Sequence, residues 1–594
     1  MPPPYIYCKP KPMHTLWDWP NWWVFRRPVV RILVVIDGSV GADPGYFFGV
    51  GKMIEILRKS APHNDPDHGF VRFDIKTATR DPAPVIGTVD YPAFRFDAVV
   101  GGELLIDKFD QIWCFGFHPG NSGQVDDAPI DAHATKVQPV ELQKLTTWMN
   151  VRGGGVLAMG DHHFLGATLA WNIPRVRAMR RWTNVDGVPP IDSPIQTGAG
   201  PIRYRHDTNQ PQNALQADPA STEQIPNDAE RDGIPQKIKL RYFGIKWRKR
   251  PHPILCSQHG EIDVLPDHPH EGWIYEDTEI REAAAYDWGG GVAGRDFPDA
   301  VDGGARPLPQ AIAWARPYPE PPYDHQKTST EVEQFAVIGA YDGHRANVGR
   351  VVVDSTWHHW FNMNIDGLQA AAESGGADQQ LAWNKIKSYF RNVAVWLSPP
   401  GKQLSMLNYA AFWSLGDPLA VEGYDAGMPS WELGETAKDI LGQWVTHCQL
   451  YDWLLPFVPV ELVDRFRDPR ELLPPQRGPF PPGPECLTCP PWRLIENAAL
   501  GGIIKAMLPE RERMIAERLS GKTPRVDADK IARAVEPGAA KGLSELRRRW
   551  QKDLEHAAKT LAQFEGPSSA AKRNVTRAIA REDLAVFETG KPEK

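Results

Sequence analysis

The feature that most constrains the fold is an alternation of short apolar runs with amphipathic segments in the first third of the chain. Val29–Ile36 reads VVRILVVI, a continuous β-branched run typical of a strand buried on both faces. The alternation continues with predicted strands and helices at Gly49–Leu57 (helix), Phe70–Thr77 (strand), Phe109–Phe117 (strand), Val140–Met149 (helix) and Val156–Met159 (strand). Strands that alternate with helices predict an α/β fold with a mostly parallel sheet.

Changes in composition divide the rest of the chain. The predicted parts are an aromatic and proline-rich arm (1–28), the α/β domain (29–400) with a polar loop insertion at about 186–236, a helical segment (401–468), a proline-rich spacer (469–491) and a helical C-terminal region (492–594). In the last region an apolar seam recurs at spacings of three and four: Leu543, Leu546, Trp550, Leu554, Ala557, Leu561 and Phe564. The seam predicts packing against another helix, in this chain or in a second copy, and so allows a homo-oligomer.

Overall composition excludes several classes of protein. The chain has 67 Lys and Arg against 74 Asp and Glu, a net charge of -7, which argues against a protein that binds nucleic acid through phosphate neutralisation. Six cysteines in 594 residues do not form a disulfide framework. The N-terminal arm lacks the pattern of a signal peptide, and no apolar run reaches the length of a membrane span. We therefore expect a cytoplasmic protein with no membrane partner.

Polar side chains follow several of the predicted strands, where they would meet at the carboxyl edge of the sheet. They are Asp37, His118, Asp161, His162, His163, His358 and His359. Ligands of open α/β sheets bind at this edge. We expect a pocket there, in which Asp161, His162 and His358 are catalytic and Asp161 or a histidine acts as general base.

The remaining groups of this edge are predicted to bind the ligand. These are Asp37, His118, His163, His359, Trp357 and Trp360, with one of the two tryptophans at the rim, where an indole can stack on a sugar ring. A structural interpretation stays open beside the functional one. Asp161 would then be the N-cap of a helix that begins at His163, and His358 would be a core imidazole bonded to a carbonyl.

Two further groups have the spacing of metal ligands. In the segment PDHPHEG, His268 and His270 point to the same side of an extended chain and could share a divalent metal such as zinc, although proline and glycine also make this an ordinary surface turn. Cys486 and Cys489 form a Cys-x-x-Cys set without a second pair at a recognised spacing. The sequence therefore leaves two alternatives: a divalent metal as cofactor, or no metal.

Four short motifs give the region from Arg31 to Pro399 a resemblance to a known family. GGGVLAMGDHH resembles a glycine-rich turn that leads into a strand and a histidine, and YFRNVAVWL resembles a final helix. Between them, HPIL from His252 resembles a His-Pro-Ile segment, and GRVVVDSTWH from Gly349 resembles a Gly-Arg-Val strand that ends in a histidine. Together and in this order they resemble the trehalose-utilisation (ThuA-like) family within the class I glutamine amidotransferase-like fold. The resemblance implies a flavodoxin-like sheet and a role in sugar utilisation.

The chain departs from the amidotransferases of that fold at their nucleophile. Those enzymes carry a cysteine in a Gly-x-Cys-x-Gly turn, and Gly160 stands in its place here. Because a thiolate is the nucleophile of that chemistry, we expect no glutamine hydrolysis. Two functions stay open: an enzyme acting on a sugar or related polar small molecule, and a catalytically inactive binding or assembly module that uses the C-terminal helices for oligomer or partner contacts.

Overall fold

The structure is a computed structural model of the chain. It describes residues 27–59, 70–84, 86–118, 136–161, 165–181, 235–243, 250–266, 273–277, 280, 286–287, 293–315, 335–415, 423–442, 445–458, 492–522 and 527–563. These residues belong to two compact units: the described residues of 29–403, here called the α/β unit, and the described residues of 27–28 and 404–563, here called the helical unit.

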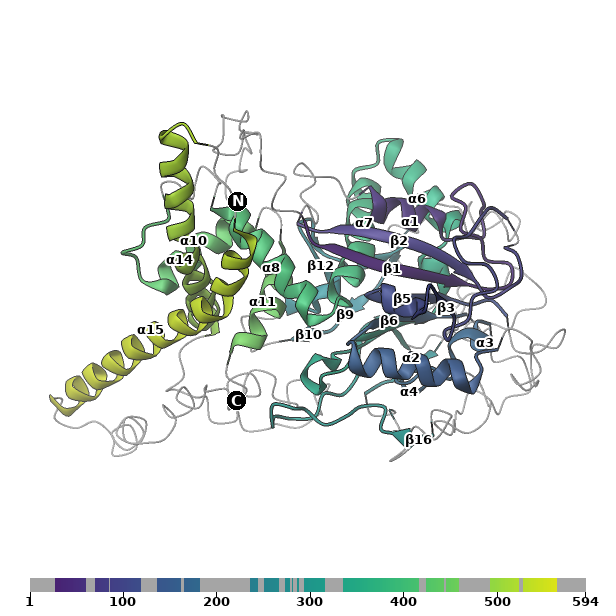
Figure 1. The fold of residues 1–594 in the computed structure, drawn as a ribbon, viewed down its shortest axis with the longest axis horizontal. Coiled ribbons are helices and arrows are strands. Elements are labelled where there is room, and N and C mark those ends of the chain that lie inside the picture. The colour runs from purple at the N-terminus through teal and green to yellow at the C-terminus, as the bar shows by residue number, and fades with distance from the viewer. Residues whose placement is uncertain are drawn as a thin grey trace. The chain divides into compact units, whose positions relative to one another are not determined.

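A ten-stranded mixed sheet forms the centre of the α/β unit (Figure 1). Its parallel part contains, in spatial order, β2 (Arg72–Thr79), β1 (Val29–Ile36), β5 (Gln111–Phe115), β6 (Gly155–Met159) and β20 (Val351–Asp354). Taken in chain order these strands are arranged 2-1-3-4-5, which is the flavodoxin-like order. The predicted α/β class with a mostly parallel sheet is confirmed.

Antiparallel strands extend the sheet beyond β20. They are β19 (Phe335–Tyr341), β18 (Gln310–Ala315), β15 (Trp273–Ile274), β7 (Arg180–Arg181) and β9 (Lys239–Leu240). Small two-stranded ribbons contain β3 (Val99–Val100) with β4 (Glu103–Leu104), β8 (Gln236–Lys237) with β14 (Val264–Leu265), β10 (Tyr242–Phe243) with β11 (Arg250–Pro251), β12 (Cys256–Ser257) with β13 (Gly260–Glu261), and β16 (Tyr286–Asp287) with β17 (Ala293–Gly294).

Helices cover both faces of the sheet, which explains why its central strands are apolar on both sides. On one face lie α1 (Gly51–Arg58), α6 (Asn362–Glu373) and α7 (Ala377–Trp396), and on the other α2 (Pro139–Val151), α3 (Ala167–Ala170) and α4 (Val176–Met179) (Figure 1). Alternate residues of β1 divide between the two faces, so that Leu33 and Val35 belong to the core beneath α2. Each of these strand residues is fully buried.

The helical unit contains most of α8 (Pro400–Ser414), followed by α10 (Ser430–Leu441), α11 (His447–Leu454), α14 (Trp492–Leu519) and α15 (Ala528–Gln563). The middle helix of this group, α14, packs against both α10 and α15. Leu543 and Leu546 of the predicted seam are buried on α15, so this part of the seam packs within the chain, whereas Phe564 lies outside the described residues. Of the helices that the structure describes, none combines the length and apolar character of a membrane span.

Candidate functional site

A first polar cluster lies where β1 and β5 end, at the point where the chain order of the parallel strands reverses. Asp37 follows β1, and its Oδ1 accepts hydrogen bonds from the backbone N–H groups of Phe117 and His118, at 2.5 and 3.0 Å. Its Oδ2 accepts from the Thr168 hydroxyl at 3.1 Å. Asp81, which follows β2, contacts His118 Nε2 at 3.0 Å. We call Asp37, Asp81, His118 and Thr168 the switch-point cluster.

Burial and charge change the proton affinities of this cluster. The pKa of Asp37 is raised because burial disfavours its charged form more than the charge of His118 and the two backbone hydrogen bonds favour it. Burial alone would lower the pKa of His118, but the hydrogen bond to Asp81 and the charges of Asp37 and Asp81 outweigh it, and the pKa is raised. The side chain of His118 is 22% exposed, so a ligand can reach it.

The raised pKa of His118 makes a prediction about stability. The pKa of an unfolded histidine is about 6.5. When folding raises this pKa, protonation of the histidine stabilises the fold, fully at pH values below about 6.5, and this contribution is lost as the pH rises through the pKa of the folded state. We therefore expect His118→Gln to cost more unfolding free energy at about pH 5.5 than at about pH 8, measured by urea unfolding. His344→Gln is the matched contrast, because burial lowers the pKa of His344 well below its usual value and the sign reverses. Equal costs of His118→Gln at both pH values would contradict the prediction.

A second polar cluster surrounds the end of β20. The fully buried Asp354 accepts hydrogen bonds from His359 Nδ1 at 2.8 Å, Trp360 Nε1 at 3.0 Å and the Tyr389 hydroxyl at 3.0 Å. Because the carboxylate accepts from Nδ1, the lone pair of the imidazole lies on Nε2. Among the residues that the structure describes, Nε2 has no hydrogen-bond partner although it is buried. Asp354 thus orients His359 in the way that a carboxylate orients a catalytic imidazole.

Asp161, at the end of β6, lies beside this second cluster. Its Oδ2 is 3.6 Å from His358 Nε2, and the two side chains are 0% and 3% exposed. Arg180 joins the ends of the two strands, because its guanidinium donates to the backbone carbonyls of Asp161, Asp354 and Ser355 at 2.9, 3.2 and 3.0 Å. Burial lowers the pKa of Arg180 to about 10, although the negative charges of Asp161 and Asp354 raise it in part. We call Asp161, Arg180, Asp354, His358 and His359 the β20 cluster.

The structure brings several of the predicted site residues together at the carboxyl edge. Asp161 and His358 approach one another across neighbouring strands, Asp37 and His118 share hydrogen bonds, and His359 lies five residues beyond Asp354. The roles assigned to these residues, and the pocket between them, stay predictions. The predictions that lie outside the described residues are those for His162, His163, His268, His270, Cys486 and Cys489.

Two details of the predicted edge need correction. Trp360 is not at a rim: it is fully buried between Trp113, Phe115, Tyr389 and Phe390 and donates to Asp354. Trp357 is 4% exposed and stacks on Phe361 with ring centroids 4.8 Å apart. Other aromatic rings therefore occupy the indole faces that a sugar was expected to use. The helix after β6 begins at Ala167 with Gly166 as its N-cap, so Asp161 does not cap it.

Sequence reasoning missed four residues of the two clusters. Asp81, Thr168, Arg180 and Asp354 supply much of the hydrogen bonding there. Of these, Asp354 had a readable signal, because it follows the apolar run VVV just as Asp37 follows VVRILVVI. Arg180 had none, since its partners are backbone carbonyls from two distant strand ends.

The structure also bears on metal and thiol chemistry. Within the described part of the chain, no group of three or more His, Cys, Asp or Glu side chains could hold a metal ion. Gly160, predicted from the sequence to stand in place of a nucleophilic cysteine, lacks the positive φ of a strained nucleophile turn. Cys114 lies fully buried in the middle of β5, and burial raises the pKa of its thiol, which disfavours a thiolate.

Comparison with known proteins gives no further assignment. No protein-family model, no curated protein and no solved structure matches the chain.

Proposed function

We propose that the protein is an enzyme that performs acid–base chemistry on a small polar molecule, such as a sugar, at the carboxyl edge of the sheet. The observation that carries the proposal is the Asp354–His359 pair, whose imidazole Nε2 is buried without a hydrogen-bond partner in the described residues. An unsatisfied buried polar atom costs about 1–3 kcal/mol, and a catalytic role is one explanation for carrying that cost. His359 is then the general base.

The other groups of the edge have supporting roles in this proposal. Asp161 and His358 form a second acid–base pair, 3.6 Å apart, a separation at which one substrate hydroxyl can contact both. His118, partly exposed and held by Asp81, binds the ligand at the switch point. The sugar itself is suggested by the resemblance of GGGVLAMGDHH, HPIL and GRVVVDSTWH to the trehalose-utilisation family, to which we propose that the α/β unit is related.

The test is turnover of a sugar panel that includes trehalose, maltose and glucose. We expect wild-type protein to convert a member of the panel, and His359→Gln and Asp161→Asn to lower kcat by about 100-fold or more, the usual contribution of a general acid or base. His344→Gln is the matched control, because this half-buried histidine precedes β20 at the opposite edge of the sheet. A wild-type protein that neither converts nor binds any of these sugars would contradict the proposal, as would full activity in His359→Gln.

A second candidate function is a catalytically inactive binding or assembly module. It is favoured by the burial of Asp161, Asp354, His358 and His359, each at most 3% exposed, and by glycine at the nucleophile position. In that case the helices of the helical unit would provide oligomer or partner contacts. The same panel separates the two functions, because an inactive module leaves every sugar unchanged in wild-type protein and in all variants.

A further inference from the structure

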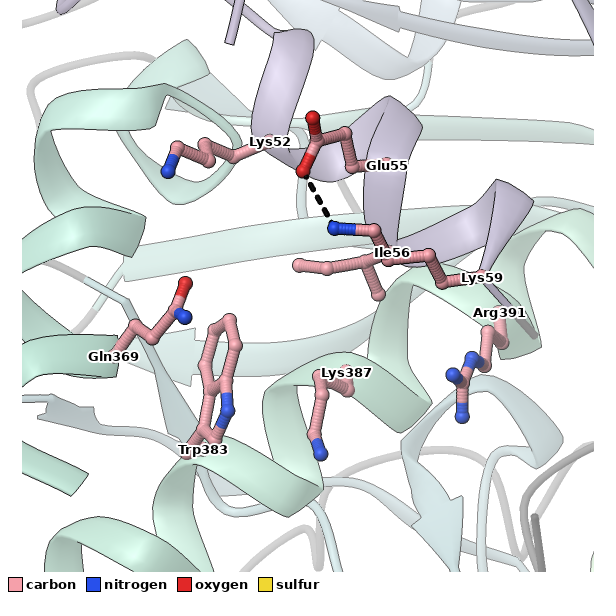
Figure 2. A pocket seen from close by; sticks show the side chains of 8 residues that line it. All are labelled: Lys52, Glu55, Ile56, Lys59, Gln369, Trp383, Lys387 and Arg391. Atoms are coloured by element: carbon pink, nitrogen blue, oxygen red, sulfur yellow. Dashed lines mark hydrogen bonds and ion pairs between the residues drawn. The ribbon is translucent and has the colours of Figure 1, made fainter. Parts of the chain in front are cut away.

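A cavity of about 340 Å³ lies in the helical layer formed by α1, α6 and α7, at a place that neither polar cluster occupies. Its lining side chains are Lys52, Glu55, Ile56, Lys59, Gln369, Trp383, Lys387 and Arg391 (Figure 2). The volume is that of a small-molecule site, at the lower end of the usual range of about 300–1,000 Å³.

Regular spacing on two helices builds the cavity. Trp383, Lys387 and Arg391 lie four residues apart on α7 and therefore share one face of that helix. Lys52 of α1 and Lys59, the C-cap residue of that helix, lie seven residues apart on one side of it, with Glu55 between them. Figure 2 shows the amine of Lys59 meeting the carboxylate of Glu55 and Gln369 of α6 beside the indole of Trp383, whereas the charged ends of Lys387 and Arg391 extend away from α1.

Positive charge dominates the lining. Four cationic side chains and one carboxylate, Glu55, line the cavity. Lys59 pairs with Glu55 at 2.9 Å, and Lys52 pairs with Asp366 at 3.0 Å. Arg391 is only 5% exposed, so its guanidinium lies at the buried end of the site. Lys387 and Arg391 are like charges one helical turn apart on α7. The charge therefore favours an anionic ligand.

An aromatic ring and an amide restrict the ligand further. The Lys387 amine lies 5.6 Å from the centroid of the Trp383 ring, so a flat apolar surface adjoins the cationic group. Gln369 adds a side chain that can both donate and accept hydrogen bonds. Arginine and lysine together are the usual partners of phosphate, and aromatic faces stack on rings.

We propose that this cavity binds a phosphate monoester of a small ring-bearing molecule. Lys387 and Arg391 contact the phosphate, Trp383 contacts the ring, and Gln369 bonds to a ring substituent. The site differs from the carboxyl edge in its residues and in its chemistry, and so the inference goes beyond the proposed enzymatic function.

Isothermal titration calorimetry of the full chain tests the proposal with glucose 6-phosphate, inorganic phosphate and glucose as probes. We expect saturable binding of glucose 6-phosphate and weaker binding of inorganic phosphate, and any binding of glucose at the carboxyl edge to be the same in wild type and in Lys387→Gln. Lys387→Gln is expected to weaken binding of glucose 6-phosphate by about tenfold or more, because it removes one charge-assisted hydrogen bond. Trp383→Leu is expected to weaken the binding of glucose 6-phosphate but not the binding of inorganic phosphate.

Controls separate this site from long-range charge and from the carboxyl edge. Lys385→Gln removes the same charge from the same helix, but the amine of Lys385 lies outside the cavity and bonds to Asp263 at 2.6 Å. The affinity of this variant for glucose 6-phosphate is expected to stay within about twofold of wild type. Asp161→Asn is expected to retain binding. The proposal would be overturned by absence of glucose 6-phosphate binding, by equal affinity for it in Lys387→Gln and wild type, or by a loss of glucose affinity in Lys387→Gln as large as the loss for its phosphate.

Discussion

Glu141→Ala is expected to lower the free energy of unfolding of the α/β unit by about 3–5 kcal/mol. Glu141 of α2 is 1% exposed and forms a bidentate ion pair with the fully buried Arg80, at 2.8 and 2.9 Å. The same carboxylate accepts from the backbone N–H groups of Phe96 at 2.9 Å and Gln138 at 3.1 Å. Alanine would leave a buried guanidinium without its counter-charge and two backbone donors without their acceptor.

Urea unfolding measures this loss, and two other variants fix its cause. Arg152→Ala removes an exposed ion pair with Asp107 from the end of the same helix, and it should cost less than about 1 kcal/mol. The double variant Arg80→Leu with Glu141→Leu removes both buried charges together and should be more stable than Glu141→Ala alone. A Glu141→Ala protein as stable as Arg152→Ala would show that the pair is not a major contributor.

The parallel part of the sheet could be predicted because its strands are buried on both faces. Val29–Ile36 was predicted with the bounds that the structure gives, since every residue of VVRILVVI except Arg31 is apolar. The helix predicted at Val140–Met149 is observed as Pro139–Val151. The short antiparallel strands gave no such signal, because two-residue strands such as Trp273–Ile274 carry no periodicity.

The carboxyl edge could be predicted in outline but not in its hydrogen bonding. Asp161 and His358 come together because strand ends of a parallel sheet meet, and this follows from strand order alone. The orientation of each imidazole depends on side chains from other elements. For example, the hydroxyl of Tyr389 on α7 donates a hydrogen bond to Asp354. A tryptophan beside a site has the same sequence signature whether it lines a rim or fills a core, and for that reason the prediction that Trp357 or Trp360 lies at a rim was wrong.

Gly542→Ala is expected to destabilise the helical unit by about 3 kcal/mol, at the upper end of the usual cost of overpacking. Gly542 of α15 faces α14 so closely that a Cβ atom on it would overlap the backbone carbonyl of Ala498 and crowd Gly502. A carbonyl of a packed helix cannot rotate away as a flexible side chain does, so α14 and α15 would have to separate. This cost exceeds the gain in helix propensity of about 1 kcal/mol that alanine brings.

Hydrogen exchange of α14 and α15 in the full chain measures the effect, because local opening reports on these two helices directly. Ser544→Ala is the matched control: it places alanine two residues further along α15 at an exposed position, and it should change stability by less than about 0.5 kcal/mol. Gly538 meets Gly502 from the preceding turn, and so Gly538→Ala should have the same sign as Gly542→Ala. Unchanged exchange in both glycine variants would mean that backbone contact between the two helices is not what holds them together.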